Sequence, residues 1–277
     1  MTGGSTNLTT GAVSATSNFD GRHWYPQLPL PSPLCFHQSL AYQGQVVILG
    51  GRDTQGKGLN TVLARGILSW HALPPMLESR WQFSAVVYRG EIWALGGKNA
   101  SHDLASVEAF DGKSWIETIA LPKPISAGSS AVFQDTIYHA GGTRAGEATP
   151  YASVYRLNLE KGSWDVVASM NRPRSSHGLV VFEGALFAIA GFDGSGGKRS
   201  TAVESFNGTV WRSTEGLIQP RSSFATWVAQ GVLYVTGGHT GEDKVTNTVI
   251  TEQFDGNNWT QSTSYPLALN GMAVAVL

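Results

Sequence analysis

Five side chains that could do chemistry recur at fixed distances from pairs of small residues. Arg80, Arg174 and Arg221 each lie sixteen residues before such a pair, and His37 and His177 each lie thirteen residues before one. The planar guanidinium of arginine binds carboxylate or phosphate through two charge-assisted hydrogen bonds. An imidazole titrates near neutral pH and can act as an acid or a base. The pattern predicts a site for a polar or anionic ligand, or an acid–base pair.

The positions equivalent to the two histidines form a set of their own. Thirteen residues before each pair, and by alignment in the C-terminal segment, stand His37, Phe83, Gly128, His177, Phe224 and Met272. If six repeats close into a ring, the two histidines face each other across it, and so do the two phenylalanines. Phe83 and Phe224 are therefore expected to line the ligand site.

Further candidate binding residues lie beside these positions. Trp81 directly follows Arg80, whereas Arg52 and His239 come just after their own pairs. Ligands of closed repeat folds are usually held by loops on one face. We therefore add Trp81, Arg52 and His239 to the arginines and phenylalanines as the predicted binding set, and His37 and His177 would be catalytic if the protein is an enzyme.

The same residues also allow structural roles. The arginines could pair with carboxylates of neighbouring loops, for which the candidates are Asp53, Asp103, Glu147 and Asp193. The histidines could cap strands or pack in a channel. Cys35 lies two residues from His37, but a buried, inert thiol is expected there. Opposed histidines cannot both come within about 2 Å of one ion, so neither a metal nor another cofactor is predicted.

An internal repeat indicates which secondary-structure elements position these side chains. Small-residue pairs occur at Gly3-Gly4, Gly50-Gly51, Gly96-Gly97, Gly141-Gly142, Ala190-Gly191 and Gly237-Gly238. A tryptophan follows each pair at a similar distance, at Trp24, Trp70, Trp115, Trp164, Trp211 and Trp259. A sustained period of about 46 residues is typical of propeller blades or solenoid repeats.

Each repeat contains signals for four short strands. An apolar run such as Val232-Leu233-Tyr234-Val235 precedes every pair except the first, and another apolar strand and a glycine turn lie upstream of it. Phe-Asp-Gly or Phe-Asn-Gly then stands five residues before four of the tryptophans, and Asp-Gly or Asn-Gly is a strong hairpin signal. Such a unit leaves both sheet faces apolar and must stack on its neighbours.

The repeat resembles the kelch family, in which Gly-Gly ends the second strand, an aromatic residue lies in the third and tryptophan opens the fourth. The resemblance covers essentially the whole chain and implies an all-β, six-bladed β-propeller with four antiparallel strands per blade. We expect one domain, 1–277, with blades at about 35–75, 80–122, 126–170, 174–218 and 221–266. The closing blade would combine one C-terminal strand, 271–277, with three N-terminal strands in 1–29.

Two repeats depart from this pattern. The first full repeat has Gly66-Ile67-Leu68-Ser69 where others have Phe-Asp-Gly, and the connection from Tyr155 to Trp164 is longer than its equivalents. We expect irregular outer strands in both.

Composition limits the partners. The formal net charge is −1, so no basic field favours nucleic acid. No apolar run is long enough to span a membrane, the N-terminal residues do not resemble a secretory signal, and one cysteine excludes an internal disulfide. A monomeric cytoplasmic protein is expected.

Two functions remain open. Many kelch domains are binding modules, and the resemblance favours a channel mouth that holds a small polar or anionic molecule or an acidic peptide. Some stand-alone kelch propellers are sialic acid epimerases, so a small-molecule enzyme with epimerase, isomerase, lyase or cyclase chemistry at the same mouth is the alternative. The residues alone do not decide whether the protein is an enzyme.

Overall fold

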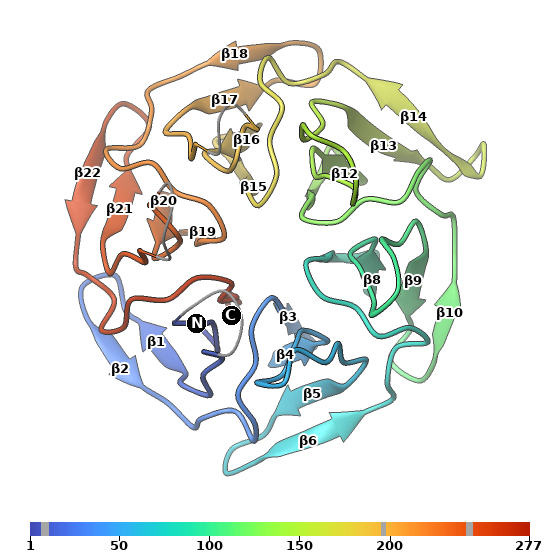
Figure 1. Cartoon of the computed structure of the whole chain (residues 1–277), viewed down its shortest axis with the longest axis vertical. Coiled ribbons are helices and arrows are strands. Elements are labelled where there is room, and N and C mark those ends of the chain that lie inside the picture. Colours follow the sequence, from blue (N-terminus) through green and yellow to red (C-terminus); the bar gives the residue numbers. More distant parts are fainter. Residues whose placement is uncertain (7–10, 195–197, 242–245) are drawn as a thin grey trace.

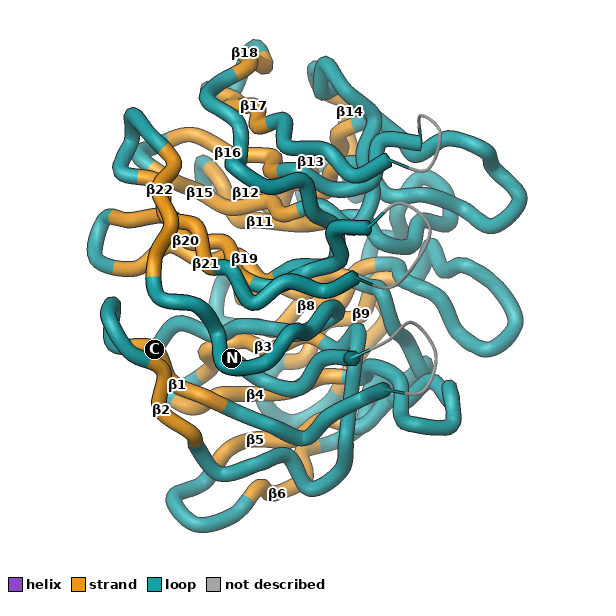
Figure 2. The backbone as a smooth tube through the Cα atoms, turned by 60° about the vertical axis from the view of Figure 1, so that its left-hand side comes forward, coloured by secondary structure: helices purple, strands orange, loops and turns teal. Residues whose placement is uncertain are grey.

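The computed structural model describes residues 1–6, 11–194, 198–241 and 246–277. Within these ranges the chain forms β-strands joined by turns and loops, without an α-helix. The strands are arranged as sectors around a central axis, and long loops project from one face of the ring (Figures 1 and 2). This arrangement confirms the predicted all-β propeller.

Five four-stranded antiparallel sheets make up most of the ring. Blade 1 contains β3 (Gln38–Tyr42), β4 (Gln45–Leu49), β5 (Val62–Arg65) and β6 (Trp70–Leu73). Blade 2 contains β7 (Ser84–Tyr88), β8 (Glu91–Leu95), β9 (Val107–Phe110) and β10 (Trp115–Glu117). Blade 3 contains β11 (Ser129–Phe133), β12 (Thr136–Ala140), β13 (Val154–Asn158) and β14 (Ser163–Val167). Blade 4 contains β15 (Gly178–Phe182), β16 (Ala185–Ile189), β17 (Val203–Phe206) and β18 (Trp211–Ser213), and blade 5 contains β19 (Ala225–Ala229), β20 (Val232–Thr236), β21 (Thr251–Phe254) and β22 (Trp259–Ser262).

The repeat tryptophans fasten each sector to the one before it. Each indole N–H donates to a backbone carbonyl of the preceding connection, as in Trp115 to Pro74 at 2.8 Å and Trp164 to Ile119 at 3.0 Å. The same bond joins Trp70 to Pro29, Trp211 to Ala168, Trp259 to Glu215 and Trp24 to Thr263. A tryptophan thus supplies both apolar burial and a satisfied polar atom at every sector boundary.

A closed ring of backbone hydrogen bonds, the belt, surrounds the axis. Its members are Phe36, Gln82, Ala127, Ser176, Ser223 and Gly271. The N–H of each donates to the carbonyl of the belt residue before it in the ring, at 2.7 to 3.2 Å, and Phe36 closes the ring by donating to Gly271. All six have a positive φ, between 50° and 59°. This left-handed conformation recurs because it directs both backbone groups to neighbouring repeats.

The terminal sector, residues 1–6, 11–29 and 271–277, differs from the predicted closing blade. It contains the two-stranded sheet of β1 (Ser17–Phe19) and β2 (Trp24–Pro26), and Thr2 forms single antiparallel bridges with Thr16 and Ala273. Five four-stranded blades are therefore found where six were expected. Thr2 forms only these single bridges in the place of a second strand, and residues 274–277 form no strand.

The expectation of irregular outer strands was wrong. In blade 1, β5 and β6 pair over four residues, and in blade 3, β13 and β14 pair over five. The Gly66–Ser69 turn is closed by a hydrogen bond from the Gly66 N–H to the Ser69 carbonyl, at 2.8 Å. Blade 2 has the equivalent backbone bond, from the Asp111 N–H to the Ser114 carbonyl at 3.4 Å, and adds bonds from the N–H groups of Lys113 and Ser114 to Asp111 Oδ1.

Gly51 and Gly44 give a test of the close packing beneath the belt. Both have a positive φ, but a Cβ on Gly51 would lie 2.6 Å from the His37 Cβ, whereas a Cβ on Gly44 would meet nothing within 4 Å. Gly44→Ala should cost about 1 kcal/mol of unfolding free energy through its backbone conformation alone. Gly51→Ala should cost at least about 2 kcal/mol more, measured by denaturant unfolding. Equal losses for both variants would contradict the packing.

Candidate functional site

The belt positions a central cavity of about 250 Å³. The residues that immediately follow the belt members all line it, and they are His37, Phe83, Gly128, His177, Phe224 and Met272. Five of them directly precede an inner strand, and Met272 precedes the bridged residue Ala273, so the belt fixes where each of these residues meets the cavity. The structure therefore brings together His37, His177, Phe83 and Phe224 as the spacing predicted.

The three predicted ligand-binding arginines do not lie at the cavity mouth. Arg80, Arg174 and Arg221 are at most 1% exposed, and each pairs with a buried glutamate of its own blade. Arg80 Nη2 contacts Glu108 and Arg221 Nη2 contacts Glu252, and Arg174 Nη2 lies 2.6 Å from Glu204. The predicted role of these arginines in binding a ligand was wrong. Their partners are also not the loop carboxylates considered above.

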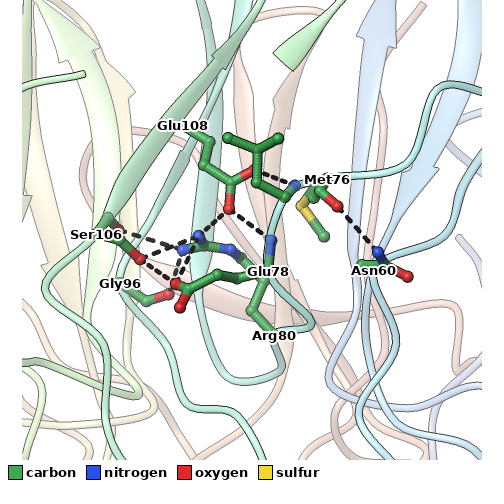
Figure 3. Close-up of polar contacts among 8 residues, drawn as sticks. Asn60, Met76, Glu78, Arg80, Gly96, Ser106 and Glu108 are labelled. Atoms are coloured by element: carbon green, nitrogen blue, oxygen red, sulfur yellow. Dashed lines mark hydrogen bonds and ion pairs between the residues drawn. The ribbon is translucent and has the colours of Figure 1, made fainter. Parts of the chain in front are cut away.

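Each arginine belongs to a hydrogen-bonded module, and Figure 3 shows the one around Arg80. Arg80 Nη1 donates to the carbonyls of Gly96 and Ser106, at 2.8 and 3.2 Å. Glu108 accepts from the Arg80 guanidinium and from the N–H groups of Leu77 and Glu78. The equivalent atoms of Arg174 and Glu204, and of Arg221 and Glu252, make the same bonds. The module therefore ties the connection between two blades to the third strand.

The repeats that lack this arginine show why the glutamate is needed. Leu34 and Ile125 occupy the arginine position, and Leu63 and Tyr155 occupy the glutamate position. Three residues before the arginine position, these repeats have Pro31 and Pro122, and the terminal sector has Pro266 before Leu269. Proline has no N–H to satisfy. A carboxylate is thus present where the connection has an N–H donor at this position, and an apolar pair is found where proline removes that donor.

The two cavity histidines are buried and neutral. His37 Nε2 is hydrogen-bonded to Thr2 Oγ1 at 3.0 Å, and burial lowers the pKa of His37 to about 4. Burial also lowers the pKa of His177, and Arg174 and His139 add to this shift. Neither imidazole is therefore charged near neutral pH. Both ring nitrogens of His177 lack a hydrogen-bond partner within the protein.

A third buried histidine, His139 on β12, was missed by the sequence analysis. Its Nδ1 is hydrogen-bonded to Ser130 Oγ at 2.8 Å, and Ser130 Oγ lies 2.7 Å from Ser84 Oγ in the neighbouring blade. A Cβ on Gly128 would lie 2.6 Å from His139 Nε2, so glycine at this cavity position gives His139 its space. The signal was present, because His139 stands where other second strands have isoleucine, alanine or valine.

The remaining candidates lie away from the cavity lining: Arg52 and His239 are in loops that follow second strands, and Trp81 is in the connection from β6 to β7. The Lys98 amine lies 5.8 Å from the centre of the Trp81 ring, and the Arg52 guanidinium lies 5.5 Å from that of Phe36. His239 is buried and exchanges backbone hydrogen bonds with Ser222. The predicted binding set therefore divides between the cavity and the loop face.

The Cys35 thiol makes a contact within the fold. The Cys35 thiol is buried, which raises its pKa, and Sγ donates to the Arg52 carbonyl at 3.7 Å. A buried, protonated thiol is a poor nucleophile. In the described ranges, no group of three histidine, cysteine or acidic side chains could hold a metal ion, and no helix is long and apolar enough to cross a membrane.

The repeats that lack the arginine suggest substitutions that test the arginine module. Glu108→Leu alone should cost about 3 to 5 kcal/mol of unfolding free energy, because it leaves Arg80 and two N–H groups buried without their acceptor. Adding Arg80→Leu and Leu77→Pro, which copies the pattern of Leu34, Leu63 and Pro31, should recover most of that loss. Denaturant unfolding of the single and triple variants measures both effects. A triple variant no more stable than Glu108→Leu would contradict this interpretation.

Known proteins share both the sequence repeat and the fold. The Kelch motif model matches residues 124–171. Kelch-like protein 41a of Danio rerio is 30% identical over 183 residues, which cover 64% of this chain and 30% of that protein. Kelch-like protein 36 of Bos taurus is 25% identical over 273 residues, covering 91% of this chain and 44% of that protein. This chain thus spans less than half the length of these relatives.

The solved structure of YjhT superposes with a TM-score of 0.76 over 88% of both chains at 14% identity, which supports the fold alone. With the repeated glycine pairs and tryptophans, these matches support the resemblance of this chain to kelch-repeat proteins.

Proposed function

We propose that this propeller is a protein-binding module whose partner docks on the loop face. The observation that carries the proposal is the pair of cation–aromatic contacts on neighbouring blades, Arg52 with Phe36 and Lys98 with Trp81. Two further cation–aromatic contacts lie in connections between strands: Lys123 with Tyr151, and Arg199 with Phe192. Aromatic and arginine side chains are enriched at the centres of protein interfaces.

The charge of this surface favours an acidic peptide. Burial lowers the pKa of Lys98, Asp103 opposes that shift, and Arg52 adds to it. Two cations on adjacent loops therefore destabilise each other slightly. A carboxylate placed between them would relieve the repulsion and form charge-assisted hydrogen bonds.

The acid–base alternative gains no support from the cavity. An efficient general acid or base has a pKa near the working pH, whereas burial lowers the pKa of His37 to about 4 and lowers that of His177 as well. The single domain, the monomeric state and the cytoplasmic location stay predictions.

Charge reversal tests the docking face. Lys98→Glu and Arg52→Glu should each weaken binding of acidic peptides selected from a displayed peptide library, by about tenfold, which corresponds to about 1.4 kcal/mol. Raising the salt concentration should weaken wild-type binding too. Lys113→Glu, in the exposed β9–β10 turn, is the matched control. If all three variants retain wild-type affinity, or if selection yields no acidic peptides, the docking face is wrong.

We also propose that the terminal sector serves as the sixth blade and closes the ring. Three observations support this. Gly271 occupies a belt position, Trp24 makes the repeat tryptophan bond to Thr263, and Thr2 exchanges two backbone hydrogen bonds with Ala273 at 2.9 and 3.2 Å. The hydrogen-bonding pattern of the other sectors therefore continues through both ends of the described chain.

Removal of residues 271–277 tests this closure. The deletion removes the two belt bonds of Gly271, the two bonds to Thr2 and the buried Met272 side chain, so the melting temperature should fall by well over ten degrees, since each hydrogen bond contributes about 1 kcal/mol. Deletion of residues 275–277 keeps all of these contacts and should change the melting temperature little. Equal melting temperatures for the two truncated proteins would exclude closure.

A further inference from the structure

A second cavity lies in the terminal sector, where both ends of the described chain are found (Figure 1). Its volume is about 510 Å³. Asn18 and Phe19 of β1 form one wall and residues 274–277 form another, and three tryptophans, Trp24, Trp70 and Trp227, also line it. A cavity of this size lies within the usual range for binding sites.

The cavity occupies the place that the start of the second strand has in the full blades. In blade 5, Thr236 of β20 pairs with both β19 and β21. Thr2 makes the equivalent bridges in the terminal sector, to Ala273 and Thr16. The first three residues of β20 are Val232, Leu233 and Tyr234. Their equivalents would lie in the cavity, between β1 and residues 275–277.

Aromatic side chains around the cavity are less covered than their equivalents elsewhere. Trp24 and Trp70 are only partly buried, whereas the repeat tryptophans of the other four sectors are 6 to 8% exposed. Phe19 is also partly buried. The equivalent phenylalanines are at most 4% exposed, and they are Phe110, Phe206 and Phe254. Apolar surface that is open here and covered in other blades is typical of an interaction site.

The walls of the cavity also offer backbone groups to a strand. The Met1 amine donates to the Ser17 carbonyl at 2.7 Å, and the Ser17 N–H donates to the Met1 carbonyl at 3.0 Å. Such pairs recur at every second residue of an antiparallel ladder, so the N–H and C=O of Phe19 face the cavity. On the opposite wall, no backbone hydrogen bond joins residues 274–277 to the rest of the described chain. Unpaired strand edges of this kind bind extended peptides.

We propose that an extended segment of a partner polypeptide binds in this cavity and adds a β-strand between β1 and residues 275–277. The inference rests on the proposed role of the terminal sector as a sixth blade, and it does not involve the loop face. The added strand completes the sheet of that sector and covers its aromatic side chains.

The other blades and the lining indicate the chemistry of the segment. An aliphatic residue followed by an aromatic one occupies these positions in blades 2 to 5, as Ile92-Trp93, Ile137-Tyr138, Leu186-Phe187 and Leu233-Tyr234. Arg65 is the only charged side chain among the described residues that line the cavity. An acidic residue before the aliphatic one therefore complements the cavity in charge.

The second strand of blade 2 supplies a probe, the acetylated peptide Gly-Glu-Ile-Trp, which copies residues 90–93. In ¹⁵N-labelled protein it should shift the amide signals of Phe19 and Ala275 saturably and slow their hydrogen exchange. The matched peptide Gly-Glu-Pro-Trp lacks the N–H that would donate to the Phe19 carbonyl, so it should bind at least fivefold more weakly. Equal affinity for the two peptides, or no saturable shift with the first, would overturn strand addition.

Shortening the chain tests the position of the added strand. Deletion of residues 275–277 keeps the closure contacts of Gly271 and Thr2 but removes one wall of the cavity, so the peptide should bind at least tenfold more weakly. Arg52→Glu, on the loop face, should bind it as the wild type does. Unchanged binding by the shortened protein, or loss of binding with Arg52→Glu, would place the peptide elsewhere. If the shortened protein does not fold, the shifts of Phe19 and Ala275 decide the position.

A fusion identifies the source of the strand. The same four residues joined before Met1 provide a tethered strand, to be compared with the free peptide. A gain in melting temperature by the fusion, with no binding of the free peptide, would overturn a separate partner. If deletion of residues 271–277 destabilises the fold but neither form of the peptide has an effect, ring closure holds and strand addition fails.

Discussion

The belt of backbone hydrogen bonds around the axis is the interaction on which the rest of the structure depends. Five of its six members are not glycine, yet all have a positive φ. Such a conformation costs about 1 kcal/mol or more for an ordinary residue and persists only where the surroundings enforce it. Here each strained residue both donates to one neighbour and accepts from the other. The strain is therefore shared around a closed ring in which no member can relax alone.

Outside the belt, each blade is held by further contacts. In every sector the residue that follows the belt member lines the central cavity. Further out, the arginine modules hold the connections between blades, and the tryptophans fasten the outer strands. The modules place charge in the interior only where a connection has a backbone N–H without an acceptor. In the other repeats Pro31, Pro122 and Pro266 stand at this position and have no N–H to satisfy. The chain therefore uses either a carboxylate acceptor or a proline at the same place in the repeat.

Much of this arrangement could be predicted from the sequence, because it follows a fixed spacing. The thirteen-residue interval from His37 and its equivalents to the glycine pairs spans one tight hairpin of constant length, so all six cavity positions were identified. The glutamate partners were missed because they lie 28, 30 and 31 residues after their arginines, across loops of variable length. The terminal sheet is less regular than expected, since Thr2 makes only single bridges with Thr16 and Ala273. His139 was missed because its hydrogen-bond partners, Ser130 and Ser84, come close to it only in the folded ring.

Two surfaces with different chemistry result from one repeat. The loops carry cations over aromatic rings, whereas the described residues that line the cavity include no charged side chain. Both depend on a continuous belt, and native-state hydrogen exchange of the belt amides tests its continuity most directly. The amides of Phe36 and Gly271 should exchange with the same free energy of opening as those of Ala127 and Ser176, close to that of global unfolding. Much faster exchange confined to Phe36 and Gly271 would show that the ring is open at the terminal sector and would contradict the closed belt.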